Sequence, residues 1–341
     1  MTLTLWLGTY LLHSTLFCGA AALWRRTLRR ADCAEPLWRA AVFLPFVTAT
    51  AVQLAGGLWT IGIGVDSSPA TLDTAAADPT LWSGVDFLLV GWLLTGGALV
   101  LRDWLAHRLF IRRLGIRHPA DVELRDILRE VMRQARVDRA IRLTYSIAVA
   151  TPVAIGRSEI CLSLRAMRDL GASQLRALIA HEVAHIARRD SWWFAVLACV
   201  ESVFFFQPLN RVARGELRRL AETACDVQAA RHVCDRVAVA RCLVEVAAWS
   251  RSAAPSTVLG VTGTSDLTVR VTRLLDPPLT LRISPRLALV AILLCSLSLP
   301  GIQDAAPSAE FLEGFAAGRR YAAGLPDPRL QALLERGRTD P

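Results

Sequence analysis

The pentapeptide at residues 181–185, His-Glu-Val-Ala-His, limits the possible folds of this chain more than any other part of the sequence. Residues four apart on an α-helix lie one above the other on the same face. A helical run would therefore let His181 and His185 bind one Zn²⁺ from a single side, with Glu182 next to them, where it could polarise a water held by the metal. Five residues also occur together by chance, so the hypothesis needs a suitable helix and a third ligand.

A helix over residues 174–189 is expected. Gly171 and Ala172 precede Ser173, a favourable N-cap residue, and the run that follows contains no Gly or Pro. Apolar side chains spaced along the run supply contacts in a helix that is otherwise rich in Ala.

The third ligand is expected from a second helix, residues 217–232. Glu222 lies about 37 residues beyond His185, and Asp226 follows four positions later on the same face. One carboxylate could bind the metal while the other accepts the outer N–H of a ligand imidazole and fixes its tautomer. In an alternative interpretation, the two carboxylates only pair with arginines of their own helix, Arg218, Arg219 or Arg231.

Composition indicates a membrane protein with a polar domain. The 341 residues are 53% hydrophobic with a mean hydropathy of +0.37, too apolar for a typical soluble enzyme. All 39 basic residues are Arg, which excludes a phosphate-binding Lys, a Schiff-base Lys and Ser-x-x-Lys acylation. The net charge of +9 reflects arginines clustered beside apolar segments, as expected near anionic lipid. No nucleic-acid motif is found, so direct nucleic-acid binding is not expected.

The eight cysteines include no CxxC pair. Several lie in apolar or candidate metal-binding segments. We interpret them as small buried hydrophobic residues in a reducing compartment, not as disulfide partners.

Four apolar segments are predicted to cross a membrane: 2–24, 40–65, 81–101 and 287–302. Arginines follow the first segment, whereas the loop after the second is acidic and contains no Arg. By the positive-inside rule, the N-terminus lies outside and the chain after Arg102 lies in the cytoplasm until the fourth span. The predicted parts are a three-helix transmembrane region (1–102), a cytoplasmic domain (103–285), a fourth transmembrane helix (286–302) and a short extracytoplasmic tail (303–341).

The predicted fold class is mainly α, with an α+β cytoplasmic domain that contains a small antiparallel sheet. Besides the two helices that carry the candidate metal ligands, further helices are expected at 120–137, 236–250 and 265–275. Strands are expected at 140–150, 152–156 and 159–163.

Residues 191–206 are strongly apolar, yet sixteen helical residues span only about 24 Å, less than the ~30 Å hydrocarbon core. A full crossing would also separate Glu222 from His181 and His185 by the membrane. The segment is therefore expected to be re-entrant or interfacial. A simple additional span would require a compensating re-entry nearby.

Three stretches, 151–156 (TPVAIG), 180–190 (AHEVAHIARRD) and 221–226 (AETACD), together resemble the BlaR/MecR-type antirepressor metallopeptidases. The resemblance implies a membrane zinc peptidase with a cytoplasmic gluzincin domain between the third and fourth transmembrane helices. It also implies one Zn²⁺ per chain, with zinc ligands His181, His185 and Glu222, Glu182 as general base and Asp226 as an orienting carboxylate. A peptide substrate would pair with the edge-strand residues Pro152, Val153, Ala154, Ile155 and Gly156.

The expected function is zinc-dependent cleavage of a protein or peptide at the cytoplasmic face of a bacterial inner membrane, in contact with lipid. A transcriptional repressor is the substrate that the resemblance suggests. Glu182 would take a proton from the zinc-bound water and pass it to the leaving amine. Tyr145 and His232 are candidates for an additional oxyanion donor, although a structural role is favoured for His232.

Direct β-lactam acylation is not expected, because the chain has no Lys and only about 38 residues follow the fourth span. A processing or quality-control protease of the HtpX or CAAX-prenyl-protease type shares the same motifs and is the alternative within the enzyme class. A non-catalytic zinc-binding protein that relays a signal is the alternative from another class. A transporter or scaffold would depend on the few polar residues within the spans, His13, Gln53 and Asp86.

Overall fold

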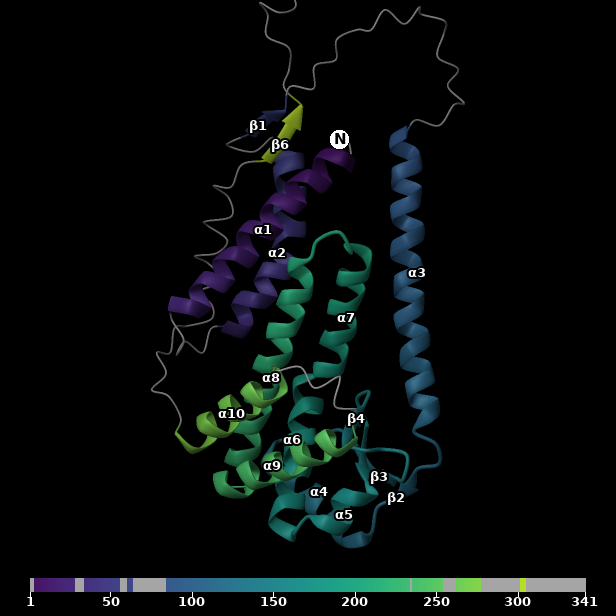
Figure 1. The fold of residues 1–341 in the computed structure, drawn as a ribbon, viewed down its shortest axis with the longest axis vertical. Helices are drawn as coiled ribbons and strands as arrows, with labels where there is room; N and C mark the ends of the chain where they lie inside the picture. Colours follow the sequence, from purple (N-terminus) through teal and green to yellow (C-terminus); the bar gives the residue numbers. More distant parts are fainter. Residues whose placement is uncertain are drawn as a thin grey trace, which may run out of the picture.

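The computed structural model describes residues 3–27, 34–55, 60–63, 84–233, 235–253, 262–276 and 301–304. Within these residues the chain is mainly helical, as predicted. An elongated group of helices leads into a domain that contains a four-stranded sheet, and the N-terminus lies at the far end from this domain (Figure 1).

Helices α1 (Leu3–Thr27) and α2 (Ala34–Ala55) pack against each other along their length (Figure 1). Their interface buries the large side chains of Tyr10 and Trp38 together with alanines, which allow the helix backbones to approach closely. Part of this cluster comes from the later helices α7 (Asp190–Val203) and α8 (Leu209–Val233), so α1 and α2 are held against the second half of the chain.

The predicted re-entrant segment forms α7, which leads away from the domain, and α8 then returns to it (Figure 1). Phe204 at the turn is buried against aromatic rings, with its ring centroid 4.4 Å from that of Tyr10. The indole Nε1 of Trp92, on α3 (Gly84–Arg113), donates a hydrogen bond of 2.7 Å to the carbonyl of Val203. These contacts fix the tip of the α7–α8 hairpin among the helices that were predicted to span the membrane.

The small sheet is mixed, not antiparallel as predicted. Its strand order is β2-β3-β5-β4, and the central pair, β3 and β5, is parallel. The strands are β2 (His118–Pro119), β3 (Arg142–Ser146), β4 (Val153–Ile155) and β5 (Glu159–Ser163). The chain passes from β3 to the outer position of β4 and turns back near Gly156 (φ +61°), so β5 inserts between them. β5 has a strand on each side, and its side chains on both faces of the sheet are buried.

Helices cover this sheet and form the core of the domain. Ile160 and Leu162 of β5 pack against Ile179 and Val183 of α6 (Ala172–Arg188), and all four side chains are completely buried. The remaining domain helices agree with the sequence prediction within a few residues, and α5 was not predicted: α4 (Val122–Gln134), α5 (Leu164–Asp169), α9 (Arg236–Ala253) and α10 (Thr262–Leu275).

The predicted N-cap of α6 was wrong. Gly171 is the N-cap, and Ser173 lies inside the first turn. The side-chain Oε1 of Gln174 accepts a hydrogen bond from the backbone N–H of Gly171 at 3.0 Å, which closes this end of the helix. At the other end Arg189 adopts φ +61°, and this left-handed residue turns the chain directly into α7.

Within the described residues, two helices are long and apolar enough to cross a membrane, Ala34–Leu54 and Asp86–Arg113. Helix α1, also predicted to span, does not reach the same apolarity. Helix α3 exposes Leu88 and Leu94 by 75% and 70%, as expected for side chains that face lipid.

The boundaries of two predicted spans differ from the structure. Helix α2 ends at Ala55, just before Gly56 and Gly57 in the sequence, and the end of the predicted 40–65 span instead forms β1 (Thr60–Ile63). Strand β1 pairs in parallel with β6 (Gly301–Asp304), which includes the last two residues of the predicted fourth span. The rest of that span, most of the tail and the acidic loop lie outside the described residues.

Ion pairs connect the adjoining ends of α1 and α2 to the later helices. Arg25 of α1 pairs with Glu216 of α8, and Glu35 of α2 pairs with Arg188 of α6. The linker between α1 and α2 therefore begins and ends on the same side as the domain, whereas β1 and β6 lie at the opposite end (Figure 1). The Arg-rich loop and the domain were predicted to share one side of the membrane.

Replacing Leu162 with Ala should destabilise the domain by about 2–5 kcal/mol, because the cavity forms in a completely buried strand. Thermal unfolding of the full chain in detergent, followed by intrinsic fluorescence, measures the loss. Ile147→Ala is the control, since Ile147 is 79% exposed. Equal melting temperatures for the two variants would contradict the assignment of the core.

Candidate metal centre

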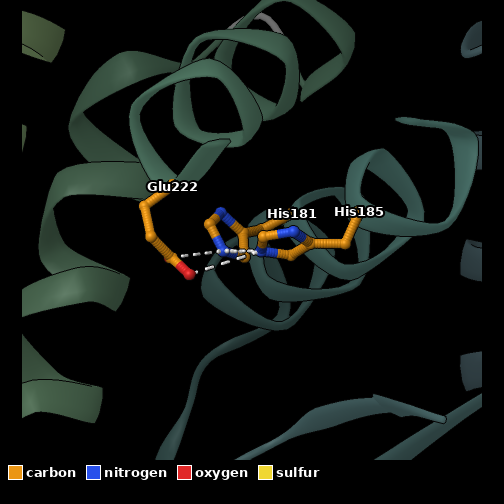
Figure 2. Close-up of side chains that lie close together, drawn as sticks. All are labelled: His181, His185 and Glu222. Carbon is orange, nitrogen blue, oxygen red and sulfur yellow. Dashed lines mark hydrogen bonds and ion pairs between the residues drawn. The ribbon is translucent and has the colours of Figure 1, made fainter. Parts of the chain in front are cut away.

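Helix α6 places His181 and His185 on one face, and α8 brings Glu222 against them (Figure 2). The two Nε2 atoms are 3.1 Å apart. The Glu222 carboxylate lies 3.5 Å from Nε2 of His181 and 3.8 Å from Nε2 of His185. Ligand atoms around a tetrahedral zinc ion lie about 3.3 Å from one another, given metal–ligand bonds of about 2.0–2.1 Å. Two imidazoles and a carboxylate at these separations thus fit a zinc site in both chemistry and spacing.

Each imidazole is held from behind by a buried aspartate. Nδ1 of His181 lies 3.0 Å from Oδ1 of Asp226, and Nδ1 of His185 lies 2.8 Å from Oδ2 of Asp190. Both aspartates are almost completely buried. A carboxylate beside Nδ1 favours the tautomer with its proton on that nitrogen, which leaves the lone pair of Nε2 directed toward the cluster.

The sequence indicated Asp226 but assigned no role to Asp190. Asp190 is the first residue of α7, directly after the left-handed Arg189. Its position five residues after His185 is unremarkable in the sequence. Only the sharp turn from α6 into α7 brings its carboxylate back onto the imidazole.

Arg270 is the second residue that sequence reasoning missed. It lies on α10 and binds both oxygens of Asp226, with Nε to Oδ2 at 2.7 Å and Nη2 to Oδ1 at 2.8 Å. Its Nη2 also lies 3.2 Å from the Glu222 carboxylate. A bidentate guanidinium offsets the cost of burying Asp226 and holds it in one orientation. The sequence carries no signal for this contact, because Arg270 is one of 39 arginines in the chain and lies on an ordinary amphipathic helix.

The charges of the cluster shift its pKa values strongly. Burial alone would lower the pKa of His181, but the carboxylates of Asp226 and Glu222 outweigh burial and raise it to about 10. Burial would raise the pKa of Glu222, but His181, His185 and Arg270 lower it to about 2. A field that favours positive charge at the imidazoles and negative charge at the carboxylate also favours a divalent cation between them.

Glu182 is also buried on α6, beside His181 in the sequence. Its charge contributes to the raised pKa of His181. Burial raises the pKa of Cys242 on α9 to about 12, and the charge of Glu182 adds to the effect. A carboxylate with little access to water, adjacent to the imidazoles, has the character required of a general base.

A second group of potential ligands, His185, Asp190 and Cys225, lies on the other side of the His185 ring. The Sγ atom of Cys225 is 3.4 Å from Nδ1 of His185. The Asp190 oxygen already pairs with Nδ1 of His185 at 2.8 Å, and burial raises the pKa of the Cys225 thiol, which disfavours the thiolate that a metal would need. The group formed by His181, His185 and Glu222 is therefore the better metal site.

The other predicted site residues lie outside this group. Tyr145 on β3 packs against His118, with ring centroids 5.5 Å apart. His232 is in the last turn of α8, ten residues beyond Glu222, or about 15 Å along the helix axis. Within the described residues, no hydrogen bond or ion pair joins either side chain to the three candidate ligands.

The predicted substrate strand forms an outer edge of the sheet. Pro152 precedes β4 and Gly156 follows it. Among the described strands β4 pairs only with β5, and it packs against α6, the helix that carries the two histidines. An extended peptide that paired with β4 would therefore lie near α6.

Replacing Asp226 with Asn should weaken zinc binding by roughly 10–100-fold, because the imidazole of His181 loses the carboxylate that orients it. Competition with a chromophoric chelator measures the affinity of the full chain. Asp266→Asn on α10 is the control, since Asp266 pairs with Arg219 and is half-exposed. Unchanged affinity in the Asp226 variant would exclude this orienting role.

Comparison with known protein families gives one match. Residues 49–274, about two thirds of the chain, match the family described as BlaR1 peptidase M56. The matched stretch contains His181, His185 and Glu222 as well as Asp190 and Arg270. A comparison with curated protein sequences gives no match.

Proposed function

Because this chain belongs to the BlaR1 peptidase M56 family, we propose that it is a zinc-dependent endopeptidase that cuts a protein substrate at a membrane surface. The family makes it a peptidase. The observation that supports zinc chemistry is the convergence of the His181, His185 and Glu222 ligand atoms within 3.1–3.8 Å of one another. A surface histidine pair would not have two buried aspartates behind it.

His181, His185 and Glu222 would hold the zinc ion through two nitrogens and a carboxylate. When bound, zinc supplies Lewis acidity and makes its water acidic enough to lose a proton near neutral pH. Glu182 accepts that proton and returns it to the leaving amine. Asp190 and Asp226 keep the imidazoles in one tautomer throughout.

The substrate would bind as an extended segment along β4. The outer edge of this strand offers backbone N–H and C=O groups for pairing, and its inner edge is occupied by β5. Pairing of this kind holds the peptide backbone in place whatever its side chains, so side-chain preference must come from contacts on either side of the strand.

We place the active site on the cytoplasmic side of a bacterial inner membrane in a chain that crosses it four times. Support comes from two apolar helices, and from the domain lying at the same end as the Arg-flanked linker between α1 and α2. α10 and β6 lie at opposite ends of the helices, as a fourth crossing between them requires (Figure 1). The proposed role is regulatory cleavage of a repressor.

Replacing Glu182 with Gln should abolish cleavage and leave zinc binding intact, because the amide cannot accept the proton but fills the same space. Quantitative proteomics of cells that carry the wild type or the variant tests the loss of cleavage. Zinc measured in the purified proteins tests whether the metal is retained. Glu123→Gln, on the exposed face of α4, is the matched control.

The outcomes separate the alternatives. Loss of one regulator's cleavage supports the regulatory role, whereas many uncut membrane proteins would indicate a quality-control or processing protease. Zinc at one per chain, with no protein cut by the wild type, would favour a non-catalytic relay. Full proteolysis by the Glu182 variant would contradict the proposed mechanism.

A further inference from the structure

A chain of buried and partly buried polar side chains leads from the candidate metal ligand His185 to the first turn of α2. Nδ1 of His185 lies 2.8 Å from Oδ2 of Asp190, and Nε of Arg188 donates to the same oxygen at 3.2 Å. The other end of the guanidinium, Nη2, donates to Oε1 of Glu35 at 2.7 Å. Four side chains thus connect residues that are 153 positions apart in the sequence.

The base of α2 makes a second contact with the turn between α6 and α7. Nη2 of Arg39 lies 2.5 Å from the same Glu35 oxygen, and the Arg39 guanidinium stacks over the ring of Trp193 at 4.5 Å. Trp193 lies in the first turn of α7, close to Asp190. α2 therefore holds both sides of the left-handed residue Arg189 that joins the two helices.

Because these side chains are largely shielded from water, a change in one of them affects the position of the others. The Asp190 side chain is 3% exposed and that of Arg188 is 15% exposed, so water does little to screen their charges. One oxygen of Asp190 faces both the imidazole and the guanidinium. The position of Arg188 therefore determines how closely Asp190 can approach His185, and Glu35 draws Arg188 in the opposite direction.

We propose that Glu35 is a positioning residue for His185, acting through Arg188 and Asp190, so that the seating of α2 sets the geometry of the metal centre. The inference rests on the proposed function only in that His185 binds the metal. It adds a route by which a movement of α1 and α2 reaches the active site. In the simpler alternative, the Glu35–Arg188 pair only anchors α2 to the domain.

Replacing Glu35 with Gln removes one of the two carboxylates that pair with Arg188, so Arg188 moves toward the other, Asp190, and draws it away from His185. Zinc affinity of the full chain in detergent, measured by chelator competition, should fall roughly three- to tenfold, less than the effect expected for a residue that touches the imidazole. The ring resonances of His185 should shift in the zinc-bound protein, where six histidines make assignment practicable.

A double-mutant cycle tests the connection. Arg188→Gln should weaken zinc binding, and Glu35→Gln should add nothing further in that background, because its effect passes through Arg188. Arg188→Lys, which keeps the charge, should restore part of the affinity. Glu216→Gln is the matched control, since Glu216 pairs with Arg25 between α1 and α8 without contacting the chain to His185.

Three outcomes would overturn the proposal. Glu35→Gln could lower the melting temperature and leave both zinc affinity and the His185 resonances unchanged, which would make the pair an anchor only. The two substitutions could be additive, which would break the connection. A wild-type chain that binds no zinc would contradict the proposed function as well. Unchanged zinc affinity in Glu35→Gln, with cleavage still lost in Glu182→Gln, would contradict only the positioning role of Glu35.

Discussion

Two buried aspartates contact the two imidazoles of α6, and the packing of the helices around the candidate metal centre makes this possible. A buried carboxylate is costly unless a cation and hydrogen bonds compensate it. Asp226 has Arg270 from α10, and Asp190 has Arg188 at the end of α6. Because the compensating cations come from different elements, the site can form only when these elements are packed together.

The sequence was sufficient for the residues whose spacing carries the chemistry. A spacing of four residues places His181 and His185 on one face of their helix, and the same spacing relates Glu222 to Asp226. Apolar runs predicted the helices α1, α2 and α3, whereas the side of the membrane inferred from arginine placement stays a prediction. Each of these rests on interactions between neighbours in the chain or on the bulk preference of a segment for lipid.

Sequence reasoning failed where a contact depends on tertiary packing. No local pattern distinguishes Arg270 from the other arginines, and Asp190 gains its role only through the turn at Arg189. The parallel pairing of β3 with β5 depends on where the β4–β5 hairpin docks, and alternation within the strands does not report that. The cap of α6 was misplaced because Ser173 is the better N-cap residue by preference, whereas Gln174 closes the helix on Gly171.

The α7–α8 hairpin also limits what can reach the centre. Glu222 follows Glu216 by six residues, or about 9 Å of helix, and Glu216 is paired with the end of α1. In the proposed topology α1 ends at the membrane surface, so the scissile bond would have to come within about two helical turns of the lipid headgroups. A folded protein domain is too large to fit into a space of about 9 Å between the headgroups and Glu222. The proposed cleavage would thereby be restricted to unstructured stretches of polypeptide, such as interdomain linkers or chain ends, and a target could escape it by folding these stretches.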